Sequence, residues 1–251
     1  MLLQVQNLNK SFSSELFKPS KQVLKGVGFS LPAHTTTGFI GVNGSGKTTS
    51  LKCLLGFIFP DHGKITFDDG KQTLEQFRHR LGYLPERPYF YDFLTAEEFL
   101  RFHWELSGGG AGFQERRDQV LDRVGLQGTG QKKLRQFSKG MLQRAGLAQA
   151  LLRHPDLLIL DEPMSGLDPD GRILVKDILL EEKKRGTTIF FSSHLLADME
   201  ELCDRLVVID DGQILFEGEQ TQLKAEESNQ NLERAFSHLR TRRLRERGGV
   251  S

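Results

Sequence analysis

GVNGSGKTTS, residues 41–50, places three glycines, a lysine and a run of hydroxyl side chains directly after an apolar segment. Glycine lets a backbone adopt conformations closed to other residues and approach an anion closely. Four positions fit the phosphate-loop pattern of glycine, four residues, glycine, lysine and serine or threonine: Gly41, Gly46, Lys47 and Thr48. In such a loop the amide hydrogens point inward, and the following helix adds its positive end. The stretch therefore predicts a site for nucleotide phosphates.

Two side chains of this loop have specific expected roles. Lys47 can reach the terminal phosphates as a mobile point charge, and the Thr48 hydroxyl can ligate Mg²⁺. A plain glycine-rich turn would leave this lysine and the two adjacent threonines unexplained. We expect the whole loop to contact the nucleotide: Gly41, Val42, Asn43, Gly44, Ser45, Gly46, Lys47, Thr48 and Thr49.

A second apolar run, 157–160, ends in the acidic pair Asp161 and Glu162. Open parallel sheets place their ligands at the carboxyl ends of strands. Asp161 suits Mg²⁺, and Glu162 could orient or deprotonate an attacking water. Two adjacent acids in a loop are usually only solvated, but the apolar run before them and Pro163 after them favour chemistry. The two stretches together predict an NTPase.

Hydrophobic patterning predicts an α/β fold. Alternation over 3–8 and 23–31 predicts strands, and the apolar runs at 157–160 and 188–191 predict parallel strands covered on both faces. A crossover helix is expected over 173–184. Further helices are expected over 48–57, from the capping box at Thr95 and Glu98, over 118–124, over 141–153, and in an arginine-rich tail over 232–247.

Composition narrows the class of protein. A net charge of +1 and a pI near 7.8 argue against a dedicated nucleic-acid domain. Cys53 and Cys203 lack metal-ligand spacing, so we expect two reduced thiols. No apolar run approaches the ~18 residues needed to cross a bilayer, and the first residues do not form a signal peptide. We therefore expect a cytoplasmic protein.

A third motif, FSKGMLQR at 137–144, resembles the signature of ABC transporter ATPase subunits, usually written LSGGQ. Ser165-Gly166-Leu167-Asp168 resembles the D-loop of that family, and Ser192-Ser193-His194 resembles its switch histidine. Phe12 lies where the family often has an adenine-stacking aromatic. The resemblance covers about residues 2–220.

This resemblance implies an ABC-type P-loop NTPase fold and a mechanism. The fold has a mostly parallel RecA-like core with an N-terminal antiparallel β subdomain and a helical subdomain at about 86–155. Beyond the resemblance, residues 221–251 are expected to form a helical, arginine-rich tail. Two ATPase subunits close around two ATP molecules. The implied catalytic residues are Lys47, Glu162 and His194; Mg²⁺ is implied at Thr48 and Asp161; and Phe12, Ser138, Gly140 and Asp168 are implied to bind nucleotide.

Two departures from the family pattern affect the expected site. The signature carries Phe137, Lys139 and Met141 where leucine, glycine and glutamine are usual, and a lysine beside a phosphate is favourable. Glu86 occupies the position of the Q-loop glutamine, which leaves its role as a metal contact open. Both departures resemble the exporter branch that moves drugs, antibiotics, sodium, lipids or polysaccharides.

The expected partners are integral-membrane permease subunits and a second ATPase subunit, identical or different, at the cytoplasmic face of the inner membrane. The aromatic stretch 89–93 is a candidate for permease docking, or else local core. The alternatives are a soluble ABC ATPase acting on nucleic acid or ribosomes, and a hydrolysis-silent regulatory subunit. No coiled coil or second ATPase domain supports the first, and the presence of Lys47, Asp161, Glu162 and His194 disfavours the second. Nothing in the sequence identifies a cargo.

Overall fold

The structure, a computed structural model, describes residues 1–13, 20–227 and 231–248. The chain forms two compact units: the first comprises Met1–Gln76 and Ser192–Ser251, and the second comprises Phe77–Phe191. Parts of the expected tail at 221–251, namely 228–230 and 249–251, lie outside the described residues.

The first unit contains an antiparallel sheet in the order β2-β1-β4. Its strands are β1 (Leu3–Phe12), β2 (Lys21–Leu31) and β4 (His62–Phe67). Leu3, Val5 and Leu8 of β1 are buried, and a register shift between Val5 and Leu8 interrupts the period-two alternation expected from the sequence. After β4, an isolated bridge joins Phe67 to Gln72.

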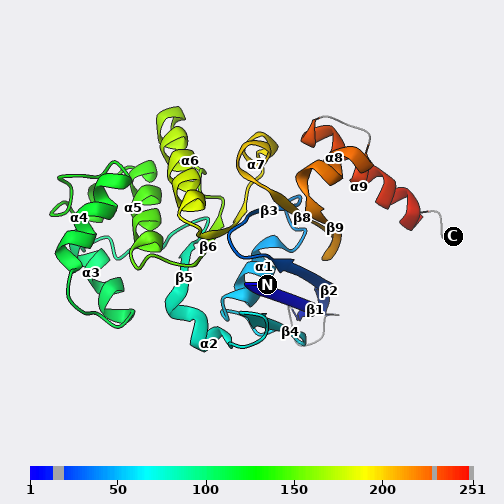
Figure 1. Cartoon of the computed structure of the whole chain (residues 1–251), viewed down its shortest axis with the longest axis horizontal. Helices are drawn as coiled ribbons and strands as arrows, with labels where there is room; N and C mark the ends of the chain where they lie inside the picture. The colour runs from blue at the N-terminus through cyan, green and yellow to red at the C-terminus, as the bar shows by residue number, and fades with distance from the viewer. Residues whose placement is uncertain (14–19, 228–230, 249–251) are drawn as a thin grey trace. The chain divides into compact units, whose positions relative to one another are not determined.

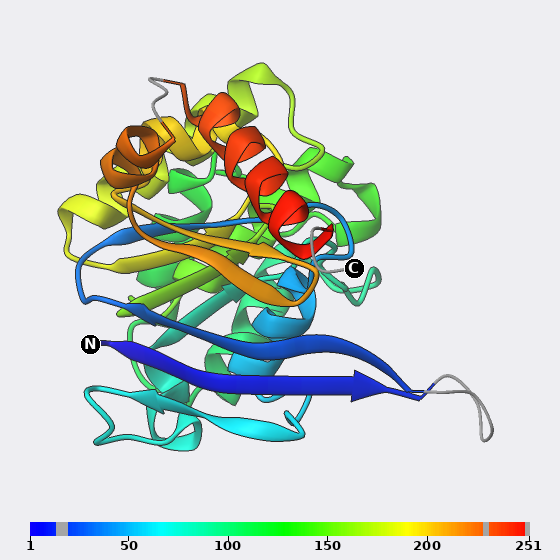
Figure 2. The same cartoon turned by 90° about the vertical axis from the view of Figure 1, so that its right-hand side faces the viewer.

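The first unit also contains strands that lead to the phosphate loop. β3 (Thr36–Ile40) pairs in parallel with β8 (Arg205–Asp210), which pairs antiparallel with β9 (Gln213–Glu219). All five residues of β3 are buried, and α1 (Lys47–Leu54) follows after the loop. The remaining helices of this unit are α2 (Leu74–Phe77, whose last residue begins the second unit), α7 (Leu196–Leu202), α8 (Gln220–Glu226) and α9 (Leu232–Gly248). Figure 2 shows α9 in red lying along β9 in orange.

The second unit has strands β5 (Leu81–Leu84), β6 (Leu157–Asp161) and β7 (Thr188–Ser192, which ends at the unit boundary), in that order. β5 and β6 are parallel, and every residue of β6 is buried, as its apolar run predicts. The helices are α3 (Ala96–Leu106), α4 (Phe113–Arg123), α5 (Lys139–Leu151) and α6 (Pro169–Lys184), with 3₁₀ turns at Arg78–Arg80 and Leu134–Gln136. Helices α3, α4 and α5 lie together in the green part of Figure 1.

Several helix boundaries differ from those expected. The Thr95 capping box forms as predicted, but α4 begins at Phe113, five residues before the expected start. Gly112 precedes it without a side-chain cap, so the sequence carries no start signal there. Among the described residues, no helix combines the length and apolar composition needed to cross a membrane.

Candidate functional site

The phosphate loop forms a tight turn in which two positions, Gly41 and Gly46, have no room for a side chain. A Cβ on Gly41 would lie 2.4 Å from Ser45 Oγ and 2.5 Å from the carbonyl oxygen of Ile209. Gly46 has a φ of 111°, and a Cβ there would lie 2.9 Å from Leu24 Cδ2. The pattern seen in the sequence therefore corresponds to close backbone approach and a left-handed conformation.

The polar groups of this loop fit a phosphate. Lys47 Nζ donates to the carbonyl oxygens of Gly41 at 2.6 Å and Val42 at 3.3 Å, so the ammonium lies over the loop. The buried Ser45 hydroxyl finds no hydrogen-bond partner within the part of the chain that the structure describes. No side chain caps the start of α1, and Thr48 is exposed in its first turn. An oxyanion bound here could accept a hydrogen bond from the Ser45 hydroxyl and would lie at the positive end of α1.

Asp161 is the last residue of β6 and Glu162 follows it, and the two side chains lie in different environments. Asp161 is 3% exposed. Burial of Tyr83, together with the charge of Asp161, raises the pKa of Tyr83 to about 12. Glu162 is partly exposed and has a φ of 52°, which is uncommon for a residue with a side chain. Its carbonyl oxygen accepts from the Ser165 amide at 3.0 Å. Strain of this kind, about 1–3 kcal/mol, concentrates at functional sites.

Gln143 is a residue whose role the sequence did not reveal. It lies on α5, is 4% exposed, and its amide nitrogen donates to the carbonyl oxygens of Glu162 at 3.4 Å and Pro163 at 3.3 Å. The signature helix therefore holds the backbone of the acidic loop in the same chain. The sequence signals this contact only through the place of Gln143 inside the motif at 137–144.

The other signature residues gather around the start of α5 in the second unit. Ser138 is the N-cap, and its hydroxyl accepts from the Met141 amide at 3.2 Å. The Lys139 side chain covers Gly166, where a Cβ would lie 2.6 Å from the lysine Cε. A Cβ on Gly140 would meet Leu167 Cδ2 at 3.5 Å. The departure at Lys139 thus links the signature to the D-loop.

Asp168 ends the D-loop as the N-cap of α6. Its carboxylate accepts from the Gly171 amide at 2.8 Å, and Pro169 occupies the first helical position. This cap fixes the direction in which the D-loop enters the helix.

The predicted residues His194, Phe12 and Glu86 are each exposed. His194 follows β7, next to the buried Ser193, whose hydroxyl accepts from the Leu195 amide at 3.0 Å. Phe12 ends β1 at 41% exposure, with Lys10 Nζ 5.6 Å from its ring centroid. Glu86 is exposed 3.9 Å from Arg87, which makes it a weaker candidate for Mg²⁺ than Asp161.

The predicted site residues are divided between the two units. The first unit holds Phe12, the loop 41–49 and His194. The second holds Glu86, Ser138, Gly140, Asp161, Glu162 and Asp168. Within the second unit, the structure brings the signature helix, the acidic loop and the D-loop into contact.

Comparison with known proteins agrees with these motifs. A family model described as ABC transporter matches residues 24–165. The chain is 50% identical over 200 residues to an uncharacterised ABC transporter ATP-binding protein of Synechocystis sp., covering 78% of this chain and 56% of that protein. It is 33% identical over 237 residues to a lantibiotic transport ATP-binding protein of Streptococcus pyogenes, covering 94% of this chain and 96% of that one.

The fold is also that of a solved structure, the ATP-binding subunit of an ABC transporter. The two share 30% identity with a TM-score of 0.86, covering 95% of this chain and 99% of that one. The chain spans 56–66% of the length of the cyanobacterial relatives that it matches.

Proposed function

The chain belongs to the ABC transporter family as an ATP-binding subunit, and from this premise we propose that it hydrolyses ATP to drive transport through a membrane partner. The phosphate loop carries the proposal. Two of its glycines, Gly41 and Gly46, leave no room for a Cβ. Its buried Ser45 hydroxyl lacks a partner among the described residues, and Lys47 lies over its carbonyls. These features together suit the β- and γ-phosphates of ATP.

Each catalytic residue has a proposed role. Lys47 neutralises the terminal phosphates, Glu162 orients and deprotonates the attacking water, and His194 contacts the γ-phosphate. General-base help of this kind contributes about 10²–10⁴-fold in rate. Thr48 and Asp161 would hold Mg²⁺, with Glu86 as the weaker third candidate. Mg²⁺ held by these residues would supply charge neutralisation at the phosphates.

The site is proposed to be completed by a second ATPase subunit. Ser138 and Gly140 lie at the start of the 13-residue helix α5, whose positive end suits the γ-phosphate bound by the opposite subunit. Asp168 would contact nucleotide from the D-loop, and Phe12 would stack on adenine. ATP then holds two subunits together, and hydrolysis releases them.

ATP turnover tests the hydrolysis proposal directly. We expect Mg²⁺-dependent turnover by the wild-type chain, alone or with its permease, and at least a ~100-fold loss in Lys47→Ala. Lys52→Ala is a matched control, since this exposed lysine lies in the last turn of the same helix. Equal loss in both variants, or none in Lys47→Ala, would remove the phosphate loop from the reaction.

An exposed aromatic patch supports docking on a membrane permease. The patch consists of Tyr89, Tyr91, Phe93 and Phe102, which are 87%, 46%, 61% and 42% exposed. The ring of Tyr91 lies about 6 Å from each of the other three. Phe90 instead turns inward, 5.0 Å from Phe99. The stretch 89–93 is thus partly core and partly available surface, and we propose that the patch receives a cytoplasmic helix of the permease.

Co-purification tests the docking proposal. We expect Tyr89→Ala with Tyr91→Ala to abolish co-purification with the permease while the isolated subunit keeps its ATP turnover. Leu106→Ala, which removes an exposed apolar side chain outside the patch, should leave co-purification intact. Retained co-purification of the double variant would contradict the proposed docking surface.

Transport is proposed to be outward from the cytoplasmic face of the membrane. The similarity to the lantibiotic transport protein supports this direction. Uptake of a labelled drug or peptide antibiotic into inverted vesicles that contain the subunit and its permease would measure the direction. ATP-dependent accumulation inside those vesicles is the result expected of an exporter.

A further inference from the structure

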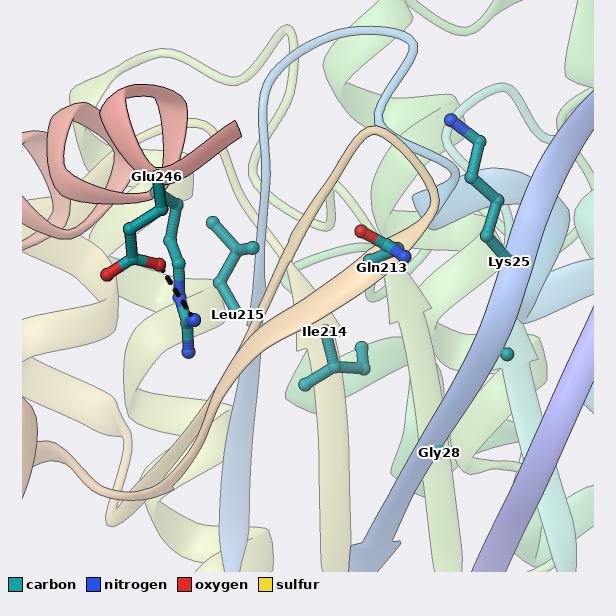
Figure 3. Close-up of a pocket in the computed structure, with 8 residues that line it drawn as sticks. Lys25, Gly28, Gln213, Ile214, Leu215 and Glu246 are labelled. Carbon is teal, nitrogen blue, oxygen red and sulfur yellow. Dashed lines mark hydrogen bonds and ion pairs between the residues drawn. The ribbon is translucent and has the colours of Figure 1, made fainter. Parts of the chain in front are cut away.

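Each unit contains a cavity lined by more than one basic side chain. The cavity of the first unit, about 450 Å³, lies between β2, β9 and α9 (Figure 3). Its cations are already neutralised, because Lys25 pairs with Asp211 at 2.6 Å and Arg243 pairs with Glu246 at 3.1 Å. An incoming anion would have to displace a carboxylate at each position.

The cavity of the second unit differs in its charge. It measures about 380 Å³ and lies where α3, the start of α4 and the end of α5 meet. Its lining includes Trp104, Gly112, Glu115, Arg116, Arg153 and His154. Gly112 and His154 are exposed, so the cavity opens to solvent. We call it the Arg116 cavity.

Arg116 is a buried cation without a carboxylate partner. It is 7% exposed, and its guanidinium donates to the carbonyl oxygens of Leu151 and Leu152 and to the side-chain oxygen of Gln119. In the described part of the chain no carboxylate forms an ion pair with it. Burial, reinforced by two neighbouring arginines, lowers the pKa of Arg116 to about 10. A buried charge of this kind is costly unless an anion accompanies it.

The buried acid whose charge acts on Arg116, Glu182, is held by other donors. Glu182 is 3% exposed and accepts from Arg123 at 2.7 Å, from Arg185 at 3.2 Å and from the Thr187 hydroxyl at 2.9 Å. Its charge is therefore shared among other donors. Glu115, the acid in the lining, is exposed and accepts from Gln119. The Arg116 cavity keeps an excess of positive charge.

Two further basic side chains face the same cavity. The Arg153 guanidinium lies 4.1 Å over the Trp104 ring and donates to the carbonyl oxygens of Gly109 and Ser107. The Nδ1 atom of His154 lies 2.8 Å from an Arg185 nitrogen. Since arginine can only donate, Nδ1 accepts and the other ring nitrogen, Nε2, carries a proton that it can donate. The uncapped start of the 11-residue helix α4 adds its amides at Gly112.

We propose that the Arg116 cavity binds a phosphate group carried by a small molecule. Arginine, a donating imidazole and a helix start are the groups that hold phosphate in proteins. The volume lies at the lower end of the range for small-molecule pockets, so it accommodates more than the bare anion. This site is separate from the phosphate loop and does not depend on ATP hydrolysis.

Trp104 makes the proposal directly measurable, because it is the only tryptophan of the chain and lines the cavity. The full chain with Lys47→Ala, which weakens the phosphate loop, is titrated with inorganic phosphate and separately with glycerol 3-phosphate. Sodium chloride keeps the ionic strength constant. We expect a saturable change in tryptophan fluorescence with at least one of the two, and tighter binding of glycerol 3-phosphate if the ligand is a phosphate ester.

Two variants assign the signal to the cavity. His154→Gly removes the imidazole while keeping a residue that accepts the φ of 49° at this position. Arg116→Met removes the buried charge. Each should weaken binding at least ~tenfold, the effect of losing one hydrogen bond to a charged group. Arg135→Gln, an exposed arginine outside the lining, should bind as the parent does.

The absence of a saturable fluorescence change with either phosphate compound would overturn the proposal. Equal affinity in the parent and in His154→Gly would overturn it as well. If Arg116→Met fails to fold, because the guanidinium also holds the end of α5, His154→Gly alone decides. Since the readout is binding and not turnover, its failure is distinguishable from failure of the proposed ATPase.

Discussion

Glu162 has a left-handed backbone conformation directly after a fully buried strand. From its place after an apolar run, the sequence predicted this residue as the group that orients or deprotonates the attacking water. It could not predict the strained φ or the bonds from Gln143 to the loop, because both depend on how distant segments pack. Patterns along a chain report residue type and spacing, whereas positioning contacts come only from the folded structure.

Gly41 provides a test of the phosphate loop at this scale. Gly41→Ala would place a Cβ 2.5 Å from the Ile209 carbonyl oxygen, so we expect a loss of roughly 1–3 kcal/mol in unfolding free energy and loss of ATP binding. Gly28→Ala is the matched control, since its Cβ would lie 3.5 Å from the nearest atom. Denaturant unfolding and nucleotide titration measure the two effects. Equal stability of both variants would contradict the tight turn.

Gln143 provides a test of positioning. Gln143→Leu would leave the carbonyls of Glu162 and Pro163 without its amide, so we expect kcat to fall about tenfold while KM for ATP stays within about twofold. Gln149→Leu, on the same helix and outside the predicted site, should leave both constants unchanged. A rise in KM for ATP without a fall in kcat would mean that Gln143 supports binding and not the alignment of Glu162.

At the scale of elements, the sequence predicted those helices that carry their own start signals. The Thr95 capping box and the strands β6 and β7 form where expected. The four-residue strand β5 was not predicted, since its position depends on pairing with β6 and not on its own pattern. The start of α4 was missed because Gly112 supplies no cap.

Alanine substitutions at two helix caps distinguish an effect on stability from an effect on ATP turnover. Thr95 and Ser138 each accept a backbone amide at the start of a helix, so alanine at either position should cost about 1 kcal/mol of unfolding free energy. Only Ser138→Ala should also reduce ATP turnover, because Ser138 is proposed to contact the opposite subunit's ATP. Thermal unfolding and turnover of the two variants check this. A similar loss of turnover in Thr95→Ala would show that the effect is structural.

At the scale of the whole molecule, the motifs predicted the family and the fold class, and both predictions are confirmed. The motifs were sufficient because their chemistry fixes residue type and order over most of the chain. The division at 76–77 and 191–192 was not predicted, since it arises from packing between segments far apart in sequence. The proposed domain boundaries at 86, 155 and 220 remain predictions.

The stability of the whole chain should fall in mild acid. Burial lowers the pKa of His103 below its ordinary value, so the unfolded chain binds a proton there more readily than the folded one. Unfolding free energy should therefore be constant above about pH 6.5 and decline as the pH falls toward the folded pKa. The slope from one histidine is at most ~1.4 kcal/mol per pH unit, and less here because the ring is partly exposed. His103→Phe should flatten the decline measured by denaturant titration, and an unchanged slope would contradict this origin.

The central claim is that two of these ATPase subunits, or one with a different partner subunit, close around ATP and that Glu162 acts on the attacking water. The most direct test is the size and ATP turnover of Glu162→Gln in ATP and Mg²⁺, with and without its permease. We expect an inactive variant that forms an ATP-dependent assembly, which for two copies has twice the 28.4 kDa mass of the chain. Turnover equal to wild type, or no ATP-dependent association under either condition, would contradict it.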